Sequence, residues 1–407
     1  MVTDTLYRSL TPYDGGRSLT KNISAGIITE DDKALILEYT DFKSTADGNG
    51  ERRIQKLIIT LAGWRRFIAV PYRTMTTTDM RAGVASLKNG INAKGTPFKP
   101  NAVHDHIKIL RQFIQWMIRE GYSTIPEQKV KEIRTPPVES GTTRPDEIIT
   151  SEEVKAILTH CSYIRDKALV ATLYESGCRI GELSRLTWRD AIFDEHGVKL
   201  YLTDTKTSKR RYARLTMATE FLAQYRNERG DPDPGSLIFL SIRGDEPISY
   251  RMVTHCLTQA ARDAGITKKI KPHLFRKSRI THLIEQNYQE SVIKQTMWNN
   301  LNTKMFQTYV CLGEDSIDDE FLGKAGIKQK KTSQEDPMAP HPCGRCHYVN
   351  PPTGTYCSKC GMALTEDAVE TQTDSMLSIE KLMATSQGEE LIKKVIREMA
   401  EKGELRG

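Results

Sequence analysis

A segment rich in proline and threonine, residues 126–147, interrupts the apolar patterning of this chain and constrains it to fold as more than one unit. It contains Pro136, Pro137, Gly141 and Pro145, and few of its side chains can be buried. We interpret this segment as a linker. A chain of 407 residues is also too long for one ordinary hydrophobic core. Separate domains are therefore expected on the two sides of the linker.

Residues 1–22 have no apolar periodicity and include two consecutive glycines, so we expect a flexible tail there. Residues 23–125 are typical of a small helical domain. Thr29 followed by Asp32 resembles the start of a helix, because such a pair caps the first backbone N–H groups. The clearest helix is expected to stop at Gly121. Its apolar stripe consists of Ile107, Leu110, Phe113, Ile114, Met117 and Ile118.

Residues 148–325 predict a second domain that is mostly helical. One helix is expected to end at Gly177, and helical patterns return between residues 250 and 310. Residues 198–203 and 211–216 alternate between apolar and polar side chains around a polar turn, which is typical of a β-hairpin. The expected fold class is therefore mainly α with a small β-sheet (α+β).

The end of the chain differs in charge from the rest. Residues 326–340 are polar and contain proline, so we expect a second linker there. Residues 366–407 form an acidic tail with a net charge of −4, in which an apolar stripe through Leu391 and Met399 predicts a terminal helix. Because the whole chain carries +7, residues 1–365 carry +11. This basic body favours a polyanion such as DNA, although ordinary surface lysines would give the same balance.

Four of the eight cysteines are clustered within residues 341–365 as C-x2-C-x10-C-x2-C. Two such pairs offer four thiolates to a tetrahedral Zn²⁺ ion, so we predict a zinc ribbon, with disulfides or free thiols as the alternatives. The zinc is expected to be structural, because no open ligand position is evident. The four scattered cysteines are expected to be buried thiols in a reducing compartment. The predicted zinc ligands are Cys343, Cys346, Cys357 and Cys360.

Several classes of protein are disfavoured. No apolar run is long enough for a membrane span and no signal-like start is present, so we expect a cytoplasmic protein. The chain also lacks a glycine-rich phosphate loop and an acidic cluster spaced for catalytic metal ions. ATP-driven chemistry and two-metal nuclease chemistry are therefore not expected.

Two basic motifs in the second domain can bind phosphate. Arg179 follows the glycine stop of a helix and begins the next helix, where backbone N–H groups and the guanidinium can face one anion. The alternative is a surface arginine that pairs with Glu182. Lys206 lies in the basic turn of the predicted hairpin, which can enter a DNA groove, and a lysine there can give a proton to a leaving oxygen. A solvated loop is the alternative interpretation.

A second group of candidates follows. His273 and Arg276 lie three residues apart behind a proline at a helix start, so they can converge on one phosphate. Trp298 can donate its indole N–H to a phosphate oxygen, and the phenol of Tyr309 can attack phosphorus. Each of these residues taken alone is more often structural, and Tyr309 is one of 15 tyrosines.

Taken together, these residues resemble the tyrosine recombinase (phage integrase) family, whose motif order is Arg, Lys, His-x-x-Arg, His or Trp, and Tyr. The six positions are Arg179, Lys206, His273, Arg276, Trp298 and Tyr309. The resemblance covers about residues 25–325, because the first helical domain is also similar to the core-binding domain of this family.

The resemblance implies a role for each position. The two arginines would bind the non-bridging oxygens of the scissile phosphate, and the lysine would protonate the departing 5′ oxygen. The histidine would take part in proton transfer with the nucleophile, and Glu182 matches a supporting acid. The tyrosine would form a 3′-phosphotyrosyl bond. Because that ester keeps the bond energy, neither ATP nor a catalytic metal ion is needed.

This chain departs from the family pattern before the tyrosine. Many relatives have Leu-Gly-His, whereas this chain has Met297, Trp298 and Asn299. Trp298 aligns with the His/Trp position, and Asn299 is the alternative. The sequence Tyr-Val-Cys-Leu, with Cys311, is similar to Tyr-Val-His-Leu of archaeal integrases. Zinc ribbons also follow the catalytic domain in some integrases of archaea or archaeal viruses, so viral genome integration is expected.

These observations predict a site-specific DNA recombinase that works on double-stranded DNA as a homotetramer on two duplexes. One alternative is a type IB topoisomerase, which relaxes DNA with similar arginine, lysine and tyrosine chemistry. The other is a catalytically inactive DNA-binding regulator that carries a zinc ribbon. The His-x-x-Arg motif and the complete residue set favour the recombinase.

Overall fold

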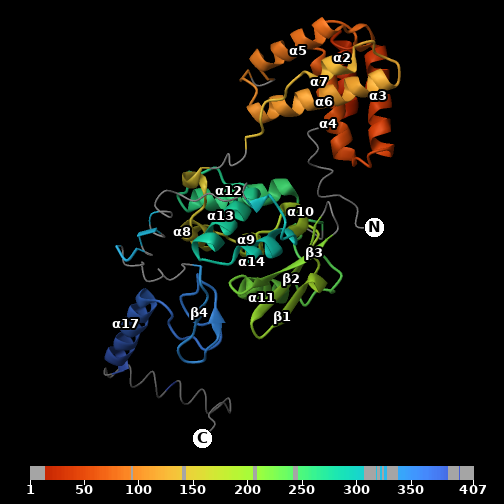
Figure 1. Ribbon diagram of the computed structural model, residues 1–407. Coiled ribbons are helices and arrows are strands. Elements are labelled where there is room, and N and C mark those ends of the chain that lie inside the picture. The colour runs from red at the N-terminus through yellow and green to blue at the C-terminus, as the bar shows by residue number, and fades with distance from the viewer. Residues whose placement is uncertain are drawn as a thin grey trace. The chain divides into compact units, whose positions relative to one another are not determined.

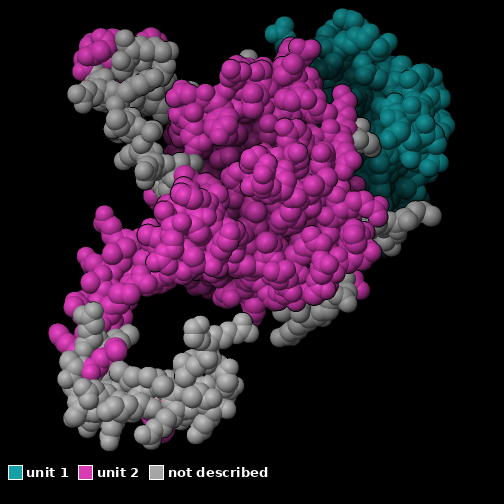
Figure 2. Space-filling model, turned by 90° about the horizontal axis from the view of Figure 1, so that it is seen from below, with its two compact units in different colours: residues 1–142 teal, residues 143–407 magenta. Residues whose placement is uncertain are grey.

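The computed structural model describes residues 14–92, 95–139, 144–204, 209–241, 246–306 and 338–383, and a few positions beyond residue 306. The chain divides into two compact units, residues 1–142 and residues 143–407, which Figure 2 shows in separate colours. Within the described residues, no helix has both the length and the apolarity to cross a bilayer. Each unit has its own hydrophobic core.

The first unit is helical (Figure 1). The predicted capping pair is present, because the Thr29 hydroxyl accepts from the Asp32 N–H and the Asp32 carboxylate accepts from the Thr29 N–H, both at 3.0 Å. The predicted stop at Gly121 is confirmed by its left-handed φ of 77°. The helices are α2 (Gly15–Ser24), α3 (Glu30–Thr45), α4 (Glu51–Trp64), α5 (Thr77–Asn89), α6 (Pro100–Arg119) and α7 (Glu127–Lys131).

Two expectations for this unit need correction. The flexible tail was expected to extend to residue 22, but α2 begins at Gly15, where a Cβ would lie within 3 Å of Gln55 and Ile58 on α4. The paired glycines therefore permit a close helix approach instead of a turn, and Leu19 is buried. The linker was expected to begin at residue 126, but α7 buries Val130 in the same core.

The second unit contains the predicted hairpin within a three-stranded antiparallel sheet, β1 (Ala191–Asp194), β2 (Gly197–Thr203) and β3 (Arg210–Leu215). The hairpin was predicted, whereas β1 was not. The sheet lies at one edge of this unit, beside the helices (Figure 1). These helices are α8 (Ser151–Thr159), α9 (Ile164–Ser176), α10 (Ile180–Leu183), α11 (Thr219–Glu228), α12 (Tyr250–Asp263), α13 (Pro272–Glu285) and α14 (Glu290–Trp298). The mainly α fold class with a small sheet is confirmed.

Helix α9 is the centre of this unit. All but two of its residues are buried, and it contacts α8, α11, α13 and β3. It ends at Gly177 in the left-handed conformation, with φ 55°, as the sequence predicts. The chain therefore turns sharply at the buried end of α9 and leads directly into Arg179.

The cysteine-bearing segment forms a small two-stranded ribbon of β4 (His341–Pro342) and β5 (Val349–Asn350). Helix α17 (Glu366–Met383) follows it. The terminal helix predicted through Leu391 and Met399 lies outside the described residues.

Candidate active site and metal centre

Arg179 lies at the N-terminus of α10, where the tight turn after α9 places it. Its backbone N–H donates to Glu182 Oε2 at 2.9 Å, and its Nη1 donates to Glu182 Oε1 at 2.9 Å. The same Nη1 also donates to Asp204 Oδ2 at 2.6 Å, just beyond the end of β2. The Arg179 side chain keeps 35% of its exposure, so an anion can reach it from solvent.

Glu182 joins Arg179 to a second arginine. Its buried carboxylate also accepts from Arg211 Nη2 at 2.7 Å. Arg211 Nη1 donates to the carbonyl of Thr296 at 2.7 Å, near the end of α14. The supporting acid of the sequence motif therefore links α10, β3 and α14.

Arg211 is buried although it lies in a run of basic residues beside the hairpin turn. Its side chain is only 3% exposed. The reason is strand alternation: Arg211 pairs with Leu202 and faces inward together with Ala213. The alternation is visible in the sequence and could have identified Arg211 as an inward residue.

Arg276 is fully buried on α13 and is held by two helix ends. Its Nη1 donates to the carbonyl of Gly177 at 2.5 Å, and its Nη2 donates to the carbonyl of Met297 at 2.7 Å. The C-termini of α9 and α14 carry partial negative charge, which stabilises the guanidinium. The guanidinium carbon also lies 5.2 Å from the ring centroid of Trp298.

His273 precedes Arg276 by one helical turn at the start of α13 and is exposed. Partial burial of its ring, followed by the charges of Arg276, Lys277 and Arg179, lowers the pKa of His273 to about 4. Its imidazole is therefore neutral at pH 7 and can accept a proton.

The two alternatives for the position before the tyrosine have different surroundings. Trp298 stacks against Arg276, as described above. Asn299 ends α14 in the left-handed conformation, and its Nδ2 donates to the carbonyl of Arg210 at 3.0 Å. Its Oδ1 accepts from Gln295 Nε2 at 2.6 Å. The Asn299 side chain thus links α14 to β3, whereas Trp298 lies against Arg276, which is a candidate for phosphate binding.

Lys206 and Tyr309 both lie outside the described residues. Among the described residues, Asp204 pairs with Arg179, and the Asp204 N–H donates to the carbonyl of Lys209 at 2.9 Å. Cys311 also lies outside the described residues.

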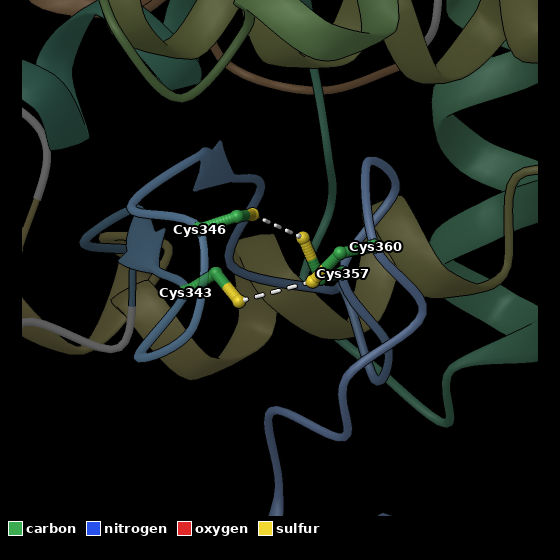
Figure 3. Close-up of side chains that lie close together, drawn as sticks. All are labelled: Cys343, Cys346, Cys357 and Cys360. Atoms are coloured by element: carbon green, nitrogen blue, oxygen red, sulfur yellow. Dashed lines mark hydrogen bonds between the residues drawn. The ribbon is translucent and has the colours of Figure 1, made fainter.

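The clustered cysteines form a second site in the same unit. The four Sγ atoms lie within 4.8 Å of one another, so one metal ion can be held between them. Figure 3 shows the four side chains converging from two loops of the ribbon. Cys343 Sγ lies 3.5 Å from Cys360 Sγ, and Cys346 Sγ lies 3.6 Å from Cys357 Sγ.

The electrostatics of the cluster favour thiolates at some positions. Burial acts to raise the pKa of Cys357, but hydrogen bonds from the backbone N–H groups of Cys360 and Lys359 outweigh it and hold that pKa at about 6. A backbone hydrogen bond from Cys346 lowers the pKa of Cys343. Such thiolates are the form in which cysteine binds a soft divalent metal.

Among the described residues, Tyr348 of the ribbon contacts a helix of the second unit. The hydroxyl of Tyr348 donates to a carboxylate oxygen of Glu220 on α11 at 2.5 Å. The sulfur cluster is therefore attached to the same unit that carries the arginine site.

Residues 147–313 match the model of the phage integrase family. The chain is 30% identical over 187 residues to the tyrosine recombinase XerD of Bifidobacterium longum, in an alignment that covers 41% of this chain and 59% of that protein. It is 24% identical over 285 residues to the tyrosine recombinase XerC of Chlamydia caviae, covering 68% of this chain and 87% of that protein. The chain thus spans less than two thirds of the first of these relatives.

A crystal structure of a lambda integrase tetramer bound to a Holliday junction is similar to this fold, with a TM-score of 0.54 and 17% sequence identity. The similarity covers 68% of this chain and 76% of that one. At this identity the comparison establishes a common fold.

Proposed function

We propose, from the phage integrase domain that residues 147–313 form, that this protein is a site-specific DNA recombinase. The observation that carries the proposal is the arrangement around Arg276. This buried arginine donates to the carbonyl of Gly177, two residues before Arg179, and its guanidinium lies over the ring of Trp298, although these residues come from three separate segments of the chain. Such a cluster of cations suits the charge of a phosphoryl transition state.

The reaction follows from the chemistry of these groups. The Tyr309 oxygen attacks phosphorus, and the neutral imidazole of His273 accepts the phenolic proton. Arg179 and Arg276 bind the non-bridging oxygens, and Trp298 donates its indole N–H to one of them. Lys206 gives a proton to the departing 5′ oxygen. A 3′-phosphotyrosyl ester results, and attack by the 5′ hydroxyl of another strand reverses the same steps.

The partners of the reaction belong to the same proposal. The protein acts on double-stranded DNA, which the helical first unit and the recombinase domain both contact, and it assembles as a homotetramer on two duplexes. The tetrameric lambda integrase structure supports this arrangement. The cysteine cluster behind the catalytic domain supports an integrase similar to those of archaea or their viruses, with genome integration as the reaction.

We test the chemistry with a nicked duplex that carries the protein's own recombination site. The wild-type protein is expected to become covalently attached to DNA, also with a metal chelator present, and Tyr309→Phe is expected to form no adduct. An adduct formed equally well by Tyr309→Phe would show that another residue is the nucleophile. Relaxation of supercoils without strand exchange would favour a topoisomerase, and binding without any adduct would favour a regulator.

We further propose that the cysteine cluster holds one structural Zn²⁺ ion through Cys343, Cys346, Cys357 and Cys360. The ion would fix the two loops of the ribbon, because four thiolates complete a tetrahedral site. Cys343→Ser is expected to reduce bound zinc to less than about a tenth of one equivalent, since apparent binding energies of such sites are large. Cys161→Ser, outside the cluster, is the matched control and should keep its zinc. Equal zinc contents of the two variants, measured by mass spectrometry of the metal, would reject the site.

A further inference from the structure

Asp204 places a carboxylate on the arginine that the proposed reaction requires for phosphate binding. Its Oδ2 lies 2.6 Å from Arg179 Nη1, and its side chain keeps 20% of its exposure. Its backbone N–H donates to the carbonyl of Lys209, so Asp204 also closes the base of the connection between β2 and β3. Asp204 thus contacts both Arg179 and Lys209.

Two guanidiniums and two carboxylates meet in the ion pairs of Arg179 and Glu182. Arg179 and Arg211 contribute two positive charges to these pairs, and Glu182 and Asp204 contribute two negative charges. A phosphodiester brings one further negative charge. Placing it beside both carboxylates would bring three anions together at a partly buried site, which is unfavourable.

The two carboxylates differ in how easily they can leave. The Glu182 side chain has no exposure to solvent, and it accepts from both guanidiniums and from the Arg179 backbone N–H. The Asp204 carboxylate reaches solvent and lies at the end of a strand. An arriving phosphate can therefore displace Asp204 at a lower cost in free energy than Glu182.

We propose that Asp204 occupies the phosphate-binding nitrogen of Arg179 in the DNA-free protein and that the scissile phosphate displaces it. This inference rests on the proposed function, since it concerns the same site. A DNA phosphate that binds Arg179 must first displace Asp204. The net free energy gained from the phosphate contact is therefore smaller.

Alternatively, Asp204 could stay bound to Arg179 and orient it, as Glu182 does. The two roles predict opposite effects of Asp204→Asn on DNA binding. A displaced competitor that loses its charge leaves Arg179 more available, so the duplex binds more tightly. A fixed support that loses its charge leaves Arg179 less well placed, so binding weakens.

The experiment measures the dissociation constant for a duplex with the recombination site, in the Tyr309→Phe background so that no covalent adduct forms. Asp204→Asn is expected to tighten binding about three- to tenfold, the range that corresponds to loss of one partly exposed ion pair. Asp194→Asn is the matched control. It removes the same charge from the same sheet, where Asp194 pairs with Arg214 and Lys199, and its effect should stay below about twofold.

Unchanged or weaker binding by Asp204→Asn, or an equal gain with Asp194→Asn, would overturn the inference. Failure of the proposed function has a different signature: proteins that retain Tyr309 would form no adduct on the nicked duplex. In that case tighter duplex binding by Asp204→Asn would still support the displaced contact, because affinity is measured without the covalent step.

Discussion

At the scale of single residues, the site depends on a buried carboxylate between two arginines. Glu182 accepts from Arg179 and Arg211, and Arg211 is itself almost fully buried. Removing one partner from a buried ion pair leaves an uncompensated charge in a medium of low dielectric constant. Glu182 is therefore important for stability as well as for the placement of Arg179.

We predict that Glu182→Gln lowers the free energy of unfolding by about 3–5 kcal/mol, the cost typical of breaking a buried pair. Urea denaturation measures this change. Glu120→Gln removes an exposed partner of Arg119 in the first unit and serves as the control, with an expected change below about 0.5 kcal/mol. Similar losses in the two variants would show that the burial of Glu182 has no special effect.

His273 gives a prediction about pH. Its pKa is about 4 in the folded protein and 6.5 as an ordinary histidine. Between these values the unfolded chain binds the proton more readily, so the free energy of unfolding should decrease as pH falls from 6.5 towards 4. Because the residue is exposed, solvent screens the nearby charges and the dependence should be shallow.

The measurement compares the wild-type protein with His273→Gln by urea denaturation above pH 6.5 and near pH 4. The variant should lose less stability than the wild type as the pH falls. An equal loss in both proteins would mean that His273 has no depressed pKa in the folded state.

The sequence predicts site residues from short local motifs and from the order of these motifs along the chain. Arg179 after a glycine stop, and His273 three residues before Arg276, are recognisable because their spacing is short. Asp204 was not predicted, because it meets Arg179 across 25 positions of sequence. Such a contact depends on how β2 and α10 are placed, and no local pattern encodes it.

At the scale of secondary structure, the site is built from helix ends. The C-terminal carbonyls of α9 and α14 hold Arg276, and the left-handed residue Gly177 brings these two ends together. A Cβ at Gly177 would lie 2.8 Å from the sulfur of Met297. A side chain at this position would therefore disturb both the turn and the acceptor of Arg276.

We predict that Gly177→Ala lowers the free energy of unfolding by about 2–4 kcal/mol, since backbone strain of roughly 1–2 kcal/mol adds to the overpacking against Met297. Gly265→Ala is the matched control. Gly265 has a φ of 73° and open space around its Cβ position, so it carries only the strain, about 1–2 kcal/mol. Equal effects of the two substitutions would show that the close approach to Met297 is unimportant.

The helices and strands that were not predicted from the sequence lack local signals such as a capping side chain. Helix α11 begins after Ala218, which has no capping side chain, and the Glu175 carboxylate accepts from the N–H groups of Met217 and Ala218 instead. That cap comes from α9, more than 40 positions earlier. By contrast, α3 and α8 have local capping boxes, and the start of α3 was predicted correctly.

At the scale of the whole molecule, the chain combines two independent cores with an attached sulfur cluster. The first unit is helical, and the second contains both the arginine site and the ribbon. The match to the phage integrase family falls within the second unit. The proposed chemistry therefore belongs to the second unit, and we expect the first unit to contribute DNA binding.

The central claim is that Tyr309 forms the covalent bond to DNA, and the most direct measurement is to identify the residue that carries the nucleotide. The adduct formed on the nicked recombination site would be digested with nuclease and protease and examined by mass spectrometry. We expect a nucleotide joined through its 3′ phosphate to the peptide that contains Tyr309. A nucleotide on any other residue, or a 5′ linkage, would contradict it.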